Sequence, residues 1–239
     1  MSAVLASSCH ARRAGVALGL AALLAIAGFT ALGMLFGYPQ ILQQPVDQIL
    51  ALFVRHQTAI MAWFGVLMVS AALMAPAGLW IGSVAGGGLG RAIRWSGIAA
   101  AVVQVAGLQR WLTLVPLIAD DAHDPARHES AVDRFAFWHR VLGTAIGETL
   151  GYLLTATFTV VVIVALRRQG LPRWLAVLGY GSATLIATGI LVPLVQPASL
   201  TNFLGYVLWC AWLLVISGIL IRGIPAGAAV ATNRQASPG

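Results

Sequence analysis

Six long apolar stretches follow one another along the chain, separated by short connections that are polar or rich in Gly and Pro. Each stretch is long enough to cross a hydrocarbon core as a helix, which takes about 20 residues. The pattern predicts an all-α fold, namely a polytopic transmembrane helical bundle with six spans. We place the spans at residues 14–37, 58–82, 95–119, 135–166, 174–195 and 201–221.

Two segments depart from a simple span. In residues 46–57, Val46, Ile49, Leu50, Phe53 and Val54 share one helical face, so we expect an amphipathic helix at the outer membrane interface. The fourth stretch would be about 48 Å long at 1.5 Å per residue, which exceeds a hydrocarbon core of about 30 Å. Its first turns should therefore project outward. Residues 83–94 and 120–134 are predicted to be loops.

The composition supports a membrane protein. Of the 239 residues, 59% are hydrophobic and only 9% are charged, against about 25% charged residues in soluble proteins. We predict one membrane domain, 14–222, between an N-terminal cytoplasmic tail, 1–13, and a disordered C-terminal cytoplasmic tail, 223–239. The arginines are scattered at the ends of spans, so no nucleic-acid partner is expected. The chain contains no lysine, which excludes a Schiff-base cofactor.

The arginines also predict the orientation in the membrane. The side that holds both termini would carry nine arginines and no acid: Arg12, Arg13, Arg91, Arg94, Arg167, Arg168, Arg173, Arg222 and Arg234. The other side would carry Arg55, Arg127, Arg134 and Arg140 together with six acidic residues. Because cytoplasmic loops are enriched in basic residues, both termini should be cytoplasmic. This is typical of a multi-pass protein of the bacterial cytoplasmic (inner) membrane, with the lipid bilayer as its main partner.

Two ionisable residues fall inside predicted spans, Arg110 in the third and Glu148 in the fourth. Their helical rise places them about 22 Å and about 28 Å from the inner boundary. Because a charge in the membrane needs protein or water around it, we expect an Arg110–Glu148 ion pair. The pair would be either a clamp between helices or part of a site that binds a ligand or handles protons. The candidate ligand-binding residues are Arg110, Glu148, Tyr152, Gln104, Arg140, His139 and His56.

The fourth span carries a small-residue series, Gly143, Gly147 and Gly151, which allows close approach of another helix. A second copy of the chain or a membrane protein partner is one candidate for that helix. Next to the glycines on the same span runs a polar stripe: Thr144, Glu148, Tyr152, Thr155 and Thr159. This stripe must face other helices or a polar cavity, and Gln104 and Gln109 of the third span are the candidates to lie opposite it.

His56 and His139 are predicted to lie level with each other at the outer mouth, about 39 Å and about 42 Å from the inner boundary. Two histidines from two helices are typical of a haem or metal site, but this pair would stand above the apolar core. A polar rim is the favoured interpretation, so we assign no metal ligand and no cofactor. The sequence holds no HExxH, P-loop, GxSxG or Cys-x-x-Cys signature. We therefore assign no catalytic residue, and a non-enzymatic role is favoured.

Two motifs of the fourth span resemble bacterial integral membrane proteins grouped as domain of unknown function 4386. They are Phe137-Trp138-His139 and the run from Gly147 to Thr155, GETLGYLLT, and the closing stretches 174–194 and 203–222 add to the similarity. The resemblance covers the chain from about residue 14 onward. It implies a membrane protein with six or seven spans, and it implies no activity and no site residue.

Three functions fit these observations. The first is binding or transport of a small amphipathic or anionic molecule through an outward-facing polar site, where Arg110 and Arg140 attract the ligand and Glu148 balances charge or carries a proton. The second is a non-catalytic accessory or structural subunit that docks a partner through the glycine-rich fourth helix. The third is a haem or metal redox protein that uses His56 and His139.

Overall fold

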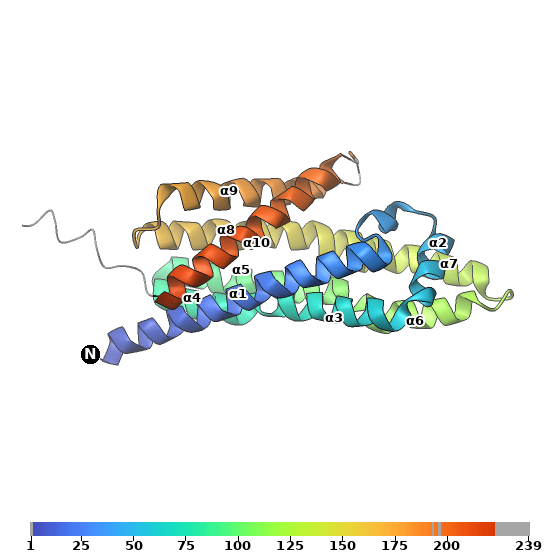
Figure 1. The fold of residues 1–239 in the computed structure, drawn as a ribbon, viewed down its shortest axis with the longest axis horizontal. Coiled ribbons are helices and arrows are strands. Elements are labelled where there is room, and N and C mark those ends of the chain that lie inside the picture. The colour runs from blue at the N-terminus through green and yellow to red at the C-terminus, as the bar shows by residue number, and fades with distance from the viewer. Residues whose placement is uncertain (1, 193, 196, 223–239) are drawn as a thin grey trace, which may run out of the picture.

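The computed structural model describes residues 2–192, 194–195 and 197–222, with side chains from residue 8 onward (Figure 1). Within those ranges the chain is helical and contains no strand, which confirms the predicted fold class. The elements are α1 (Ser2–Phe36), η1 (Gln40–Gln43), α2 (Val46–Arg55), α3 (Gln57–Ala72), α4 (Met74–Ala85), α5 (Gly87–Leu108), α6 (Arg110–Ala122), α7 (His128–Trp138), η2 (His139–Leu150), α8 (Gly151–Arg167), α9 (Arg173–Ala187), η3 (Thr188–Leu191) and α10 (Ala198–Arg222).

Six helical stretches of the described chain are long and apolar enough to cross a membrane, as the sequence predicts. They are Ser8–Phe36, Gln57–Ala85, Gly87–Ala122, His128–Arg167, Arg173–Leu191 and Ala198–Arg222. Residues 2–13, expected to form an N-terminal tail, continue the helix of the first span. The predicted C-terminal tail, 223–239, lies outside the described residues.

The two predicted loops are wrong over most of their length. Between α4 and α5 only Gly86 remains outside a helix, and its φ of 65° is a conformation that glycine adopts without strain. Gly82 and Gly90 let the two helices run on side by side, because a Cβ on Gly82 would lie 2.5 Å from the Gly90 carbonyl oxygen. At the outer end, α6 runs to Ala122 and α7 begins at His128. The charged residues there face water, so helix formation buries none of them.

The buried side chains form two clusters, one toward each end of the bundle. We call the cluster at the end of the bundle where α1 begins and α10 ends the inner core, and the one toward the α6–α7 hairpin the outer core (Figure 1). The inner core joins α1, α4, α5, α8, α9 and α10, with Phe158 and Trp212 among its fully buried members. The outer core joins the end of α1 to α2, α3, α6 and α7, and its largest member is Trp111. Figure 1 shows α2, α6 and α7 extending beyond the ends of α9 and α10. The outer core therefore belongs to the part of the bundle that projects.

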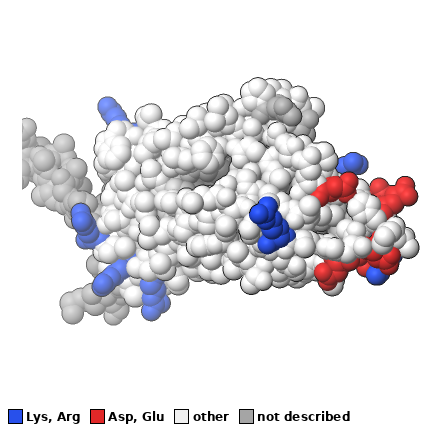
Figure 2. Space-filling model, turned by 45° about the vertical axis from the view of Figure 1, so that its right-hand side comes forward, with Lys and Arg blue, Asp and Glu red and all other residues white. Residues whose placement is uncertain are grey.

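The helix α2 confirms the predicted amphipathic segment, since Ile49, Leu50 and Phe53 are buried against the outer core. An ion pair links it to α7, with Asp47 Oδ1 3.2 Å from His128 Nε2. Figure 2 shows basic side chains at one end of the molecule and acidic ones at the other, with a largely uncharged band between them. This distribution follows the predicted arginine asymmetry.

Acidic and basic side chains pair with each other at the tip of the α6–α7 hairpin. Asp121 lies 2.6 Å from Arg127 Nη1 and 2.5 Å from Arg134 Nη2. Asp124 accepts a hydrogen bond from Arg127 Nε at 2.8 Å and another from the Ala126 amide at 2.9 Å. These bonds favour the charged carboxylate and lower the pKa of Asp124.

Candidate functional site

Arg110 occupies the joint between α5 and α6. Gln109 interrupts the helix immediately before it, and Pro116 follows inside α6, where it has no N–H to donate to the carbonyl of Leu112. The Arg110 side chain is 4% exposed. Its Nη1 donates a hydrogen bond of 2.5 Å to the Gly107 carbonyl, one turn back on the same stretch. The joint thus holds a cation in the interior of the bundle.

Aromatic and glycine residues surround this guanidinium. Its Cζ lies 5.3 Å from the centre of the Trp111 ring, a cation–π contact. On the opposite helix, a Cβ added to Gly143 would lie 2.8 Å from Arg110 Nη2 and 3.1 Å from His139 Nδ1. Gly143 therefore lets the guanidinium and the imidazole converge against the backbone of η2. We call Arg110, His139 and Gly143 the Arg110 site.

The predicted Arg110–Glu148 ion pair is wrong. The ion pairs of the described residues lie at the outer tip, and none within 4.0 Å involves Arg110 or Glu148. The two charges are still near enough to interact electrostatically. The prediction assumed an α-helix around Glu148, whereas η2 is a π-helix with a wider turn, which changes the direction of each side chain. The prediction matched the depths of the two residues in the membrane, but depth does not determine the direction in which each side chain points from its helix.

The glycine series of the fourth span contacts the third span of the same chain. A Cβ on Gly147 would lie 3.0 Å from Gly107 Cα, and one on Gly151 would lie 3.2 Å from Gln104 Cγ. This contradicts the idea that Gly143, Gly147 and Gly151 dock a second copy or another membrane protein. Their close-approach face is already filled by α5 and Arg110.

The lower part of the polar stripe is packed between helices. Gln104 Nε2 donates to Thr155 Oγ1 at 2.7 Å, and Trp209 Nε1 donates to Thr159 Oγ1 at 2.8 Å. Both threonines are fully buried. We call Gln104, Thr155, Thr159 and Trp209 the structural polar layer. Gln109, the other predicted facing residue, bonds instead to Thr113 on its own helix at 2.7 Å.

The remaining candidates fall into two groups. Tyr152 lies close enough to Arg110 and Glu148 to interact electrostatically, and its ring is 5.9 Å from that of Tyr206. Arg140 is exposed, and His56 lies at the corner between α2 and α3. Neither of these two lines the cavity beside Arg110. The structure therefore brings Arg110 and His139 together, places Glu148 and Tyr152 nearby, and leaves Arg140 and His56 apart.

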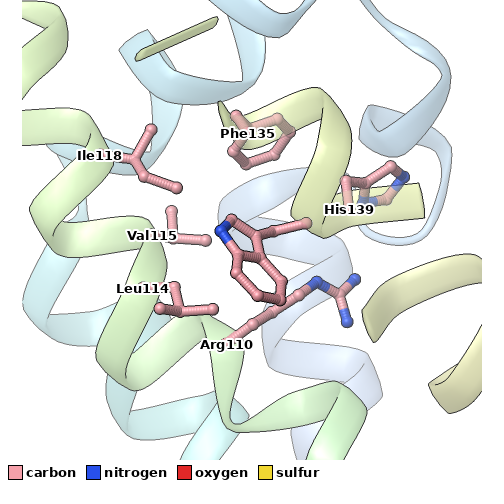
Figure 3. A pocket seen from close by; sticks show the side chains of 7 residues that line it. Arg110, Leu114, Val115, Ile118, Phe135 and His139 are labelled. Atoms are coloured by element: carbon pink, nitrogen blue, oxygen red, sulfur yellow. The ribbon is translucent and has the colours of Figure 1, made fainter. Parts of the chain in front are cut away.

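The cavity lies between α6 and the α7–η2 stretch (Figure 3). Its volume is about 10 Å³, and it is lined by Arg110, Leu114, Val115, Ile118, Phe135, Trp138 and His139. His139 Nδ1 and Trp111 Nε1 are buried without a hydrogen-bond partner. Trp138 and Gly107 were not predicted as site residues. Gly107 could have been found from its place one turn before Arg110, whereas nothing in the pattern marks Trp138 as lining a cavity.

A metal or haem site at His139 fits this geometry poorly. Nδ1 of His139 faces the same point as the Arg110 guanidinium, and a fixed positive charge repels a metal ion. Among the described residues no three His, Cys, Asp or Glu side chains form a group that could hold a metal. The donor set of the site is suited to an anion.

Comparison with known proteins gives a family and no activity. The family model described as Domain of unknown function (DUF4386) matches residues 13–217, which include the Arg110 site, the cavity lining and the structural polar layer. The chain belongs to this family. No curated protein and no solved structure matches the chain. For this DUF4386 protein, function has to be argued from the Arg110 site itself.

Proposed function

We propose that this protein binds a small anionic molecule at the Arg110 site, on the outward-facing side of a bacterial cytoplasmic membrane. One observation carries the proposal: the guanidinium is 4% exposed, and no carboxylate of the described chain lies within 4.0 Å of it. A buried charge without a partner costs several kcal/mol. A bound anion would supply the missing charge, and the unpartnered His139 Nδ1 would supply a second hydrogen bond.

The charge distribution supports the proposed orientation. The end of the bundle opposite the Arg110 site carries Arg12, Arg13, Arg91, Arg94, Arg167, Arg168, Arg173 and Arg222, and all seven acids lie elsewhere. Under the positive-inside rule that basic end is cytoplasmic, as are both termini, and residues 14–222 form the membrane domain. Reporter fusions that are active only in the cytoplasm or only in the periplasm test this at each terminus. A periplasmic terminus would reverse the assignment.

The structure narrows the ligand class proposed from the sequence. Sites for drug-sized molecules are clefts of about 300–1,000 Å³, and the cavity beside Arg110 holds about 10 Å³. An amphipathic molecule therefore finds no room in this conformation, while a small anion does. Of the two ligand classes expected from the sequence, we therefore keep a small anion and drop an amphipathic molecule.

The test is anion-dependent stability of the purified full-length protein. A ligand that binds the folded state raises the unfolding midpoint by mass action. We expect at least one of chloride, nitrate, acetate or phosphate to raise the midpoint of the wild type in a saturable way. Arg110→Gln should abolish the rise, and Arg110→Lys should retain part of it. Arg140→Gln is the matched control, since it removes an exposed arginine that does not line the cavity. A wild type that responds to no anion, or an equal loss in the control, would refute the proposal.

A further inference from the structure

The cavity beside Arg110 sets a strict limit on what occupies it. About 10 Å³ is the room of a single water molecule or a single ion of similar size. Five of the seven lining residues are apolar or aromatic: Leu114, Val115, Ile118, Phe135 and Trp138. Figure 3 shows Leu114, Val115 and Ile118 on one side of this site, with the Arg110 guanidinium and the His139 imidazole toward the other side. A polyatomic oxyanion needs more room and more hydrogen-bond donors than this lining offers.

The polar side chains that line the cavity are Arg110 and His139. The guanidinium is a donor, and Nδ1 of His139 is a donor in the tautomer that carries its proton on that nitrogen. Arg110 Nη2 and His139 Nδ1 lie 2.8 Å and 3.1 Å from the position that a Gly143 Cβ would take. Nη1 is held by the Gly107 carbonyl, and the imidazole is stacked on Phe135 at 5.7 Å. Both donors are thus fixed in place before anything binds. A guanidinium and one imidazole N–H, with no carboxylate in the lining, favour a negative ion over a cation.

Resting on the proposed function, we infer that the anion is a halide of chloride size, bound in the cavity between α6 and the α7–η2 stretch. A spherical halide accepts hydrogen bonds from any direction, so two fixed donors suffice. The apolar walls exclude the water that would otherwise hydrate the ion, which strengthens its attraction to the guanidinium. A negative charge on Glu148 would oppose binding, because Glu148 also lies near enough to Arg110 to interact with it electrostatically.

The experiment uses full-length protein in detergent with gluconate as the starting anion. Chloride and bromide are compared with sulfate, phosphate and acetate at equal ionic strength, with the unfolding midpoint as the readout. We expect saturable stabilisation by the halides alone. Arg110→Gln and His139→Leu should weaken halide binding about 10-fold or more, whereas Glu148→Gln should tighten it because it removes the competing charge. Arg140→Gln should leave it unchanged.

Tryptophan fluorescence locates the ion independently of stability. Trp138 lines the cavity, so bromide, which quenches through the heavy-atom effect, should quench part of the emission with the same midpoint concentration as the thermal effect. Trp138→Phe should remove that part of the quenching and keep the thermal response. This readout remains informative if Arg110→Gln folds poorly.

The outcomes separate the two proposals. If phosphate, sulfate or acetate stabilises the protein through Arg110 and halides do not, the halide inference fails and anion binding at the Arg110 site stands. If halides stabilise Arg110→Gln as well as the wild type, the assigned position is wrong. If no anion has any effect and the cavity holds only water, both proposals fail.

Discussion

The structural polar layer joins the third, fourth and sixth spans, and the Arg110 site lies between the third and fourth. Both bury polar groups, yet they differ in how their hydrogen bonds are satisfied. In the structural polar layer, Gln104 and Trp209 each donate to a threonine hydroxyl. Beside Arg110, by contrast, the indole of Trp111 and Nδ1 of His139 have no partner. In the structural polar layer, the Gln104 and Trp209 donors therefore have their acceptors within the chain. Beside Arg110, the proposed anion would supply a partner that the chain does not.

The largest expected effect comes from removing the buried charge. Arg110→Met should raise the stability of the anion-free protein by about 1–4 kcal/mol, because an apolar side chain of similar length avoids the desolvation of an unpaired cation. Thermal unfolding in gluconate measures this. Arg140→Met, at an exposed position, should show no such gain. If Arg110→Met destabilises the protein, the hydrogen bonds and charge of the guanidinium are already satisfied within the chain, as the hydrogen bonds of the structural polar layer are.

A second prediction concerns the backbone contact that lies between the two regions. Gly107→Ala would place a Cβ 2.6 Å from Gly147 Cα, and neither backbone can yield without moving its helix. We expect a loss of about 1–3 kcal/mol in unfolding free energy, as overpacking costs elsewhere. Gly181→Ala is the control, because nothing lies within 4 Å of its Cβ position. Equal stability of the two variants would show that the helices do not approach as described.

The structural polar layer should respond to a smaller change. Thr159→Val keeps the shape of the side chain and removes the hydroxyl that accepts the Trp209 indole N–H at 2.8 Å. The expected cost is about 1 kcal/mol, with the anion response intact. Thr113→Val, at an exposed threonine, should cost less. If Thr159→Val abolished the anion response, the two regions would not be independent.

The smallest effect is expected at the outer tip, where polar groups are satisfied and also exposed. The Arg127 hydrogen bond lowers the pKa of Asp124 in the folded state, so its contribution to stability is present at neutral pH. It is lost as the pH falls through that lowered pKa. We expect the unfolding midpoint of Asp124→Asn to change less than that of the wild type between pH 6 and about pH 3. High salt should shrink the difference, as it does for exposed ion pairs.

Periodicity and length were enough to predict the elements that depend on the chain alone. The six spans, the amphipathic helix α2 and the overlong fourth span follow from how many apolar residues stand in a row and on which face. The resemblance to domain of unknown function 4386 came from short motifs and is confirmed by the family match over residues 13–217. The lengths of the loops at residues 83–94 and 120–134 were overestimated. Glycine runs and charged residues occur both in loops and in helix ends that contact water, so the sequence pattern does not distinguish the two.

What the sequence by itself determined is therefore the number of spans, their charged ends and the burial of Arg110, because insertion into a hydrocarbon core depends on composition and length. Only the tertiary structure decided which atoms meet. Glu148, in the π-helix η2, lies outside ion-pair distance of Arg110. The glycine face is filled by the contact between Gly107 and Gly147, and the Arg110 guanidinium donates back to the Gly107 carbonyl. These outcomes depend on the rotation of each helix about its axis, which packing against neighbours sets and which no periodicity along one chain specifies.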